Sequence, residues 1–94
     1  MKLNENYKAI IDLDKLLTEE AIPHDIGRAF DGWIIEYRVD GWKKGDAIQH
    51  MAVHRAEHGV MEVWGFGLKE PVRCYTVAEA AEFFRKAWEE DSNQ

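Results

Sequence analysis

The chain has 94 residues, and its 12 basic and 18 acidic side chains give a net charge of −6. A chain of this length buries only about two thirds of its unfolded surface, so we expect a single domain over residues 1–94. The negative charge has the wrong sign for binding nucleic-acid phosphates. Direct binding of nucleic acid is therefore not expected.

The sequence has no apolar run close to the roughly 18 residues needed to cross a bilayer. Its first residues, MKLNENYKAI, lack the apolar core of a signal peptide. The single cysteine, Cys74, cannot form an intramolecular disulfide, which agrees with a reducing compartment. We expect a cytoplasmic protein with no membrane partner.

The first element is expected to be a helix over residues 5–20. Apolar side chains recur there at spacings of three and four, including Ile10, Leu13 and Leu17. The helix should end before Pro23, because a proline pushes the preceding residue out of the helical region.

A second helix is expected to begin at Thr76. The stretch TVAE at 76–79 is a capping box, in which the Thr76 hydroxyl and the Glu79 carboxylate each bind a free backbone amide. Apolar residues continue at helical spacing to Trp88, and the helix should end near Glu90.

Between these helices the hydrophobic period changes to two, which predicts strands. Residues 33–39 alternate, with Trp33 on one side and Ile34 on the other. The dipeptide Asp-Gly precedes and follows this run, at 31–32 and 40–41, as in tight hairpins. If the first dipeptide is a two-residue loop, residues 24–30 form the first strand, with Phe30 opposite Trp33 and Ile26 opposite Tyr37.

Residues 60–68 are expected to form a further strand. Trp64, Phe66 and Leu68 would share one side of it, whereas Gly65 and Gly67 would leave the other side bare. A strand face without side chains allows close approach by a helix, a second subunit or a ligand.

Residues 47–58 fit either a helix or a strand on local rules. Asp46 could cap a helix and Gly59 could end it, and the segment is rich in helix formers. Its apolar residues, however, do not form a continuous helical stripe. As a strand, the segment would turn near residues 57–59 into the strand at 60–68.

Trp42 lies in DGWKKGD, a segment that we expect to be a polar loop. An aromatic side chain there has no obvious core to join, so Trp42 is the first candidate for a partner contact. The Asp-Gly-Trp repeat, at 31–33 and 40–42, is explained by turn chemistry without a ligand.

Several stretches resemble small uncharacterised proteins of Firmicutes prophages and other mobile elements. They are LTEEAIPHD at 17–25, FDGWIIEY at 30–37, AIQH at 47–50, VMEVWGFGL at 60–68 and VRCYTVAEAAEFFRKAWEE at 72–90. In that group a "GIPH" segment, a "DGW" hairpin, a "VIQH" strand, an "EIMGL" strand and a final helix occur in the same order. The resemblance covers roughly residues 10–90, rests on packing and turn motifs, and implies a strand at AIQH.

His50, His54 and His58 are spaced four apart, which on a helix would suggest a metal site. On a strand, residues four apart are separated by about 13 Å, too far to share one ion. We therefore expect no metal and no cofactor. The resembling proteins follow their "IQH" with Gly, Ser and Tyr, which implies that the later histidines are not a fixed feature.

No catalytic constellation is evident, so an enzyme is not expected. A nucleophile needs an adjacent base and a group that holds the base. The only serine, Ser92, lies near the end of the chain, and Cys74 reads as a small buried hydrophobe. The segment GWKKGD lacks the spacing of a phosphate-binding loop.

The order of elements predicts an α+β two-layer sandwich. It would consist of a four-stranded antiparallel meander with both helices on one face. The expected core is Leu13, Leu17, Ile26, Phe30, Trp33, Ile35, Tyr37, Trp64, Phe66, Val77, Phe84 and Trp88.

Two layers would leave one face of the sheet uncovered, with Ile34, Gly65 and Gly67 on or near it. We expect a non-catalytic protein-binding accessory factor of a prophage or mobile element, whose partner is a second copy or a host protein. One alternative is an acidic decoy that inhibits a host nucleic-acid-binding enzyme. Another is a small-ligand or metal-binding domain.

Overall fold

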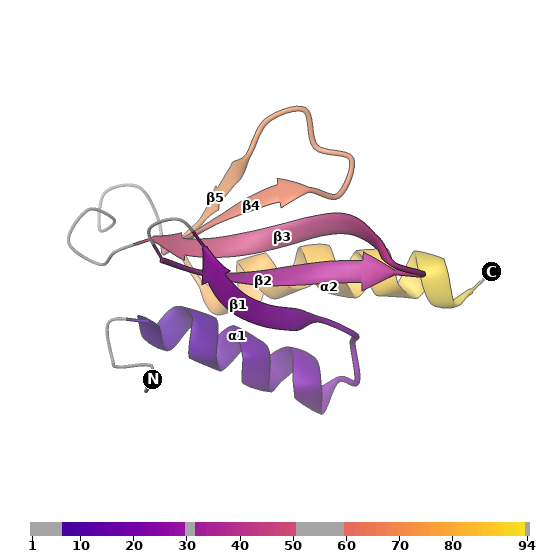
Figure 1. Cartoon of the computed structure of the whole chain (residues 1–94), viewed down its shortest axis with the longest axis horizontal. Helices are drawn as coiled ribbons and strands as arrows, with labels where there is room; N and C mark the ends of the chain where they lie inside the picture. The colour runs from indigo at the N-terminus through magenta and orange to yellow at the C-terminus, as the bar shows by residue number, and fades with distance from the viewer. Residues whose placement is uncertain (1–6, 30–31, 51–59, 94) are drawn as a thin grey trace.

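The computed structural model describes residues 7–29, 32–50 and 60–93. Along the chain, one helix precedes five strands and a second helix follows them (Figure 1). The elements are α1 (Lys8–Glu19), β1 (Asp25–Ala29), β2 (Gly32–Val39), β3 (Trp42–His50), β4 (Met61–Gly65), β5 (Val72–Cys74) and α2 (Val77–Ser92).

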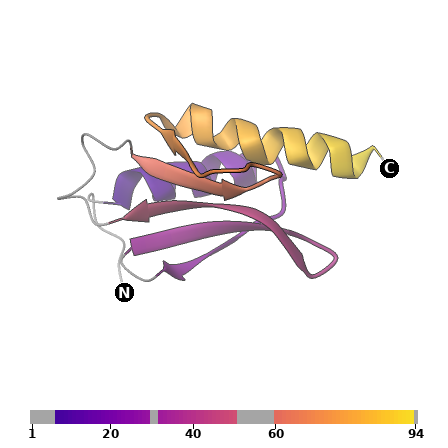
Figure 2. The same cartoon turned by 90° about the horizontal axis from the view of Figure 1, so that it is seen from above.

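The strands form one antiparallel sheet in the order β1-β2-β3-β4-β5. Both helices cover the same face of it, α1 mainly on β2 and β3, and α2 mainly on β4 and β5 (Figures 1 and 2). The α+β meander with both helices on one face is therefore confirmed. A fifth strand, the three-residue β5, adds to the expected four.

Neither described helix has the length and apolarity that crossing a bilayer would require.

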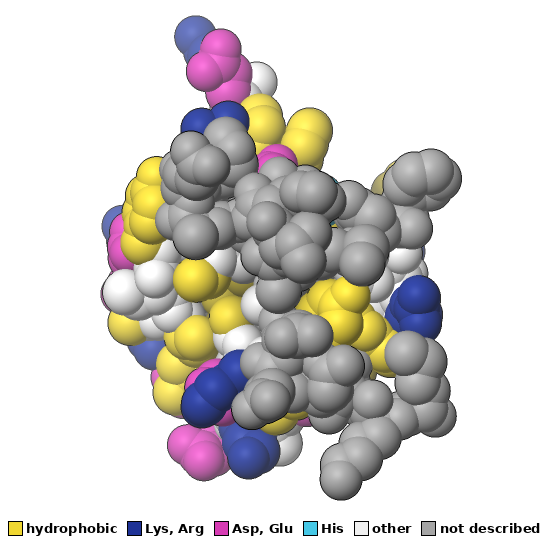
Figure 3. Space-filling model, turned by 90° about the vertical axis from the view of Figure 1, so that its left-hand side faces the viewer, with side chains coloured by type: hydrophobic (Ala, Val, Ile, Leu, Met, Phe, Trp, Pro, Cys, Tyr) yellow, Lys and Arg dark blue, Asp and Glu magenta, His cyan; other side chains and the backbone are white. Residues whose placement is uncertain are grey.

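At the end of the molecule opposite the C-terminus of α2, positive and negative side chains lie next to one another on the part that the structure describes (Figure 3). Among those residues the charge is mixed and forms no patch of one sign.

Helix α1 buries Ile10, Leu13 and Leu17 against the sheet. Its N-cap residue, Tyr7, makes no side-chain capping bond. The buried side chain of Gln49 on β3 compensates in part, because its Oε1 accepts a hydrogen bond of 3.0 Å from the backbone N–H of Ile10. A strand side chain thus satisfies one of the free amides at the start of the helix.

Replacing Gln49 with methionine is expected to lower the free energy of unfolding by about 1–3 kcal/mol. Methionine has a similar shape but leaves the Ile10 N–H without its acceptor in a buried site. Urea unfolding followed by circular dichroism measures the loss. An unchanged unfolding midpoint would show that this long-range cap contributes nothing.

Helix α2 begins as the capping box predicts. The Glu79 backbone N–H donates to the Thr76 hydroxyl at 3.1 Å. The Glu79 carboxylate accepts in turn from the Tyr75 backbone N–H at 3.2 Å. Two free amides are thereby satisfied at the helix start.

The predicted register of the first hairpin is wrong by two residues. Ala29 pairs with Gly32, and Ile26 lies opposite Ile35 instead of Tyr37. Both registers place the same side chains on the same face, so the alternating pattern could not distinguish them. Gly32 belongs to the sheet, where a Cβ would lie 2.0 Å from the Gln49 carbonyl oxygen.

The second Asp-Gly dipeptide forms the tight turn that the sequence predicts. Asp40 and Gly41 have φ values of 53° and 83°, and Trp42 pairs with Val39 across the hairpin. The expected polar loop at 40–46 is wrong, because β3 already begins at Trp42. Trp42 is nevertheless 76% exposed.

The chain leaves the sheet sooner than expected after β4. Gly65, Phe66 and Gly67 all have positive φ values, of 82°, 52° and 79°, so the strand ends at Gly65 and not at Leu68. The alternation predicted for Trp64 and Phe66 is broken there. Phe66 packs against the core, whereas Trp64 is 45% exposed on the opposite face of the sheet.

The core lies between the sheet and the helices. Of the predicted core residues, five are fully buried and four are partly buried against the core: Leu13, Leu17, Ile35, Tyr37 and Phe84, then Trp33, Phe66, Val77 and Trp88. The prediction that Ile26 belongs to the core is wrong, because its side chain is 39% exposed. Ile26 lies on the edge strand β1, whereas the helices lie mainly over β2 to β5. Phe30 lies outside the described residues.

Candidate functional site

The face of the sheet opposite the helices carries an apolar centre formed by Ile34, Ile48 and Trp64. We call it the open face, because none of the described helices or strands lies on it (Figure 2). Ile34 on β2 lies directly opposite Ile48 on β3. On its other side Ile34 faces Gly27 of β1, which has no side chain to cover it.

Charged side chains border one end of the open face and are paired with one another. Lys43 contacts Asp46 at 2.5 Å and Glu36 at 3.4 Å, and Arg38 also contacts Glu36, at 3.5 Å. The hydrogen bond to Asp46 is the main cause that raises the pKa of Lys43. Asp46 is buried, and Lys43 neutralises its charge there.

His50 and Glu62 border the other end, with 3.2 Å between His50 Nε2 and Glu62 Oε1. Glu62 lies opposite Ile48 on one side and Arg73 on the other. Polar and charged side chains therefore border the apolar centre at both ends. The open face offers apolar contact in its middle and polar side chains in mutual contact at its margins.

Two of the four predicted partner-binding residues, Ile34 and Gly65, line one shallow groove of about 500 Å³ on the open face. Lys43, Asp46, Ile48 and Trp64 also line it. Gly65 allows a close approach of the protein's own chain, since a Cβ there would lie 2.7 Å from the Lys44 carbonyl oxygen. That packing accounts for this glycine without a partner, and its role in binding stays a prediction.

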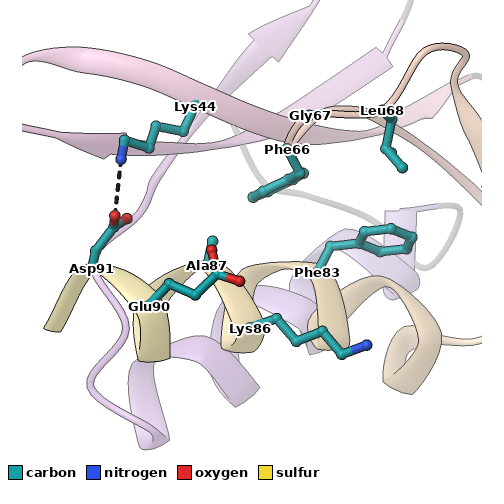
Figure 4. Close-up of a pocket in the computed structure, with 9 residues that line it drawn as sticks. All are labelled: Lys44, Phe66, Gly67, Leu68, Phe83, Lys86, Ala87, Glu90 and Asp91. Carbon is teal, nitrogen blue, oxygen red and sulfur yellow. Dashed lines mark hydrogen bonds and ion pairs between the residues drawn. The ribbon is translucent and has the colours of Figure 1, made fainter. Parts of the chain in front are cut away.

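Gly67 and Trp42 lie elsewhere. Gly67 lines a second hollow, also of about 500 Å³, between the last turns of α2 and the turn that follows β4 (Figure 4). We call it the α2 pocket. Its lining residues are Lys44, Phe66, Gly67, Leu68, Phe83, Lys86, Ala87, Glu90 and Asp91.

Asp91 closes one end of the α2 pocket and joins α2 to β2 and β3. Its Oδ2 accepts a hydrogen bond of 2.6 Å from the Tyr37 hydroxyl, and its Oδ1 accepts one of 2.9 Å from Lys44 Nζ (Figure 4). These two hydrogen bonds, that from Lys44 first, lower the pKa of Asp91. Burial, followed by the bond to Asp91, raises the pKa of Tyr37.

The lowered pKa of Asp91 predicts a loss of stability in acid. Its stabilising effect is complete above the unfolded carboxyl pKa of about 3.9 and disappears as pH falls through the lower folded pKa. For Asp91→Asn, we therefore expect a smaller fall in the urea midpoint between pH 7 and pH 3 than for the wild type. Glu89→Gln, which removes the neighbouring exposed carboxylate, should leave the wild-type fall unchanged. Equal pH dependence in the wild type and Asp91→Asn would contradict this role.

The histidine ladder is only partly described. His50 is the last residue of β3, so the predicted strand is confirmed as far as that residue. His54 and His58 lie outside the described residues. Within residues 7–29, 32–50 and 60–93, no group of three or more His, Cys, Asp or Glu side chains could hold a metal ion.

The described residues that most resemble catalytic groups have structural roles. The buried Cys74 thiol has its pKa raised to about 11, mainly by burial, which opposes thiolate formation. His24 contacts Asp14 Oδ1 through Nε2 and the Ile22 carbonyl oxygen through Nδ1, both at 2.7 Å. Both ring nitrogens are thus engaged, and the contacts join α1 to the segment that leads into β1.

The sequence interpretation missed Ile48 and Trp64 on the open face and Phe83 and Glu90 at the α2 pocket. Ile48 had a usable signal, because it alternates with the buried Ala47 once the strand is assigned. Trp64 also had a usable signal, because it alternates with the buried Val63 and shares its side of β4 with Glu62. The pocket had none, because it depends on the left-handed turn at 65–67, which no local pattern requires.

Comparison of the chain with protein-family models, with curated proteins and with solved structures gives no match.

Proposed function

We propose that this protein is a non-catalytic protein-binding domain that docks a partner on the open face. One observation carries the proposal: Ile34, Ile48 and the half-exposed Trp64 lie together on a sheet face that none of the described elements covers. Exposed apolar surface of this kind is typical of interaction sites. The resemblance to proteins of prophages and mobile elements supports an accessory role in such an element.

The partner should present an apolar surface with few charges. Trp64 is the kind of large aromatic side chain that contributes most to binding when it becomes fully buried. Lys43 and Arg38 together balance the charges of Glu36 and Asp46, so these carboxylates have little need of cations from a partner. Apolar contact at the centre of the face would then supply most of the affinity.

The charges of the face favour a protein partner over the acidic-decoy alternative. A decoy of nucleic acid needs unpaired carboxylates at regular spacing, as in a phosphate backbone. Here Glu36 and Asp46 lie in ion pairs with Lys43 or Arg38, and Glu62 lies 3.2 Å from His50 Nε2 and opposite Arg73. The face therefore lacks the array of free negative charge that a decoy would use.

Affinity capture with matched variants tests the proposal. Ile34→Lys places a charge at the centre of the open face, and Ile26→Lys places the same charge on an exposed isoleucine of the opposite face. We expect one defined protein from the producing cell to bind the wild type and Ile26→Lys but not Ile34→Lys. Circular dichroism establishes that both variants are folded.

Two outcomes would count against this function. A partner that Ile34→Lys retains as well as the wild type does not bind the open face. The proposal also requires at least one protein that the wild type captures and Ile34→Lys does not. If no such protein is found, the open face has no partner and the proposal fails.

A further inference from the structure

Asp46 is a buried carboxylate on the open face with one oxygen that lacks a partner. The residue is 4% exposed, and its Oδ2 contacts Lys43 Nζ at 2.5 Å. Its Oδ1 is also buried, but among the described residues no hydrogen-bond donor reaches it. Buried polar atoms are rarely left in this way, because an unmatched acceptor loses its bonds to water without replacement. The site is therefore short of one donor.

The cations closest to Asp46 in the chain do not supply that donor. Lys43 is held by Asp46 Oδ2 and by Glu36. Lys44 also lines the groove of the open face, but its Nζ lies in an ion pair with a residue of α2 on the helix side of the sheet. With Arg38 beside Lys43, two cations already balance the two carboxylates. The donor that Oδ1 lacks is thus expected to be a neutral N–H or O–H group.

Asp46 lies at the apolar centre of the open face. It is opposite Trp64 in the sheet, and both residues line the groove of about 500 Å³ together with Ile34 and Ile48. Trp64 is 45% exposed, so it offers aromatic surface there. Binding sites are typically apolar hollows of this size with a few polar groups that orient the ligand. The groove combines aliphatic and aromatic walls with one unmatched acceptor.

A donor reaches Asp46 Oδ1 only after a neighbouring side chain changes its rotamer. The oxygen is buried, but the side chain of Lys43 is 41% exposed and Trp64 is 45% exposed, so both have room to move. Rotamer changes of this kind are common when an interface forms. A partner that displaces one of these side chains and donates to Oδ1 would supply the hydrogen bond that the described chain does not make.

An indole ring meets these requirements better than other apolar side chains. Its one polar atom is an N–H that only donates, so the ring satisfies Oδ1 and leaves no polar atom of its own unmatched. A phenol hydroxyl also donates, but its oxygen is an acceptor that needs a further donor. Phenylalanine and the aliphatic side chains bring no donor. Indole rings also favour stacked or edge-on contact with another aromatic ring, which Trp64 provides.

We propose that the open face recognises a tryptophan of its protein partner, whose ring lies against Trp64 and whose indole N–H donates to Asp46 Oδ1. The inference rests on the proposed function, because it names the residue that the partner presents to the same face. Ile34 and Ile48 supply the remaining apolar contact. Tryptophan is among the residue types most enriched in the side chains that dominate the affinity of protein interfaces.

An NMR titration with two small probes tests the hydrogen bond without a protein partner. Indole and benzofuran share the same fused-ring shape, but benzofuran has an oxygen in place of the N–H. The full chain should bind indole at least about tenfold more tightly, because benzofuran cannot donate to the carboxylate. The methyl signals of Ile34 and Ile48 should shift, and that of Ile26 should not. No binding of indole, or equal affinities for the two probes, would overturn the proposal.

Two carboxylate variants test the role of Asp46. Asp46→Leu replaces the carboxylate with an apolar group of similar shape, and the preference for indole over benzofuran should disappear. Asp25→Leu removes an exposed carboxylate of the same face that does not line the groove, and the preference should remain. A preference that survives in folded Asp46→Leu would contradict the bond to Oδ1. The comparison of the two probes on the wild type needs neither variant, so it decides the matter even if Asp46→Leu does not fold.

Short peptides distinguish a protein partner from a free indole compound. The blocked peptide acetyl-Gly-Trp-Gly-amide should shift the same Ile34 and Ile48 signals and bind at least about tenfold more tightly than acetyl-Gly-Phe-Gly-amide. Binding of indole without binding of the tryptophan peptide would mean that the groove takes a small molecule. That result would overturn recognition of a partner's tryptophan.

The probe titrations and the affinity capture can fail separately. If Ile34→Lys loses a captured protein but the wild type shows no preference for indole, the open face keeps its function and the tryptophan inference is wrong. If the preference is present but no protein is captured, the proposed function fails, and the assignment of the indole to a protein partner fails with it.

Discussion

Replacing Phe84 with alanine is expected to lower the free energy of unfolding by about 3–5 kcal/mol. Phe84 on α2 is fully buried, and its ring lies 5.1 Å from that of Phe66 and 6.3 Å from that of Tyr37, centroid to centroid. Its removal would leave a cavity where α2, β2 and the turn after β4 meet. The whole free energy of unfolding of such a domain is about 5–15 kcal/mol, so the variant should be close to unfolding at room temperature.

Phe83 provides the matched control. It is the adjacent residue of the same helix, but it is only partly buried at the wall of the α2 pocket. Phe83→Ala should therefore lower the free energy of unfolding by only about 1–2 kcal/mol. Urea unfolding of both variants gives the comparison, and equal midpoints would show that Phe84 is not at the centre of the core.

Replacing Gly45 with alanine is expected to lower the free energy of unfolding by about 1–3 kcal/mol, because the added methyl group overpacks the site. Gly45 on β3 is buried under the ring of Phe66, and a Cβ there would lie 2.3 Å from two ring carbons. The ring would have to move away from Tyr37, on which it stacks at 6.0 Å. The α2 pocket, which Phe66 lines, should change shape as well.

Gly27→Ala is the control for this effect. Gly27 is also a strand glycine, but a Cβ there would meet nothing within 4 Å. Alanine also restricts the unfolded chain, so this variant should be neutral or slightly stabilising. Thermal unfolding distinguishes the two, and a Gly45→Ala protein as stable as Gly27→Ala would mean that Phe66 does not pack on Gly45.

The helices and the sheet faces could be predicted from the sequence because their causes are local. Thr76 and Glu79 cap α2 through bonds between neighbouring residues, and the stripe that includes Ile10 fixes the buried face of α1. Alternation likewise placed Ile34 on the face away from the helices. These features follow from the spacing of apolar residues along the chain and from the capping residue at the start of α2.

The register and the end of β4 could not be predicted, because their causes are tertiary. Gly32 lies within the sheet because the backbone of β3 passes too close for a side chain. The position of Phe66 against the core depends on the positive φ values at Gly65 and Phe66, which end the alternation after Trp64. A non-glycine residue with positive φ leaves no signal in a hydrophobic pattern.

The candidate site was predicted only in part for the same reason. Trp42 was singled out as an aromatic residue without a core to join, and it is exposed. The α2 pocket, however, combines residues from β3, from the turn after β4 and from α2, which only the folded chain brings together. The pairing of Lys43 with Asp46 also requires the strand geometry, since the sequence predicts a loop at both residues.

The most direct measurement of the central claim, that the open face binds a protein partner, is an NMR titration of the labelled chain with the captured partner. The methyl signals of Ile34 and Ile48 and the indole N–H signal of Trp64 are predicted to shift or broaden. The signals of Ile26 and of the outer faces of α1 and α2 are predicted to stay unchanged. Perturbation confined to the helices, with Ile34, Ile48 and Trp64 unaffected, would contradict the account.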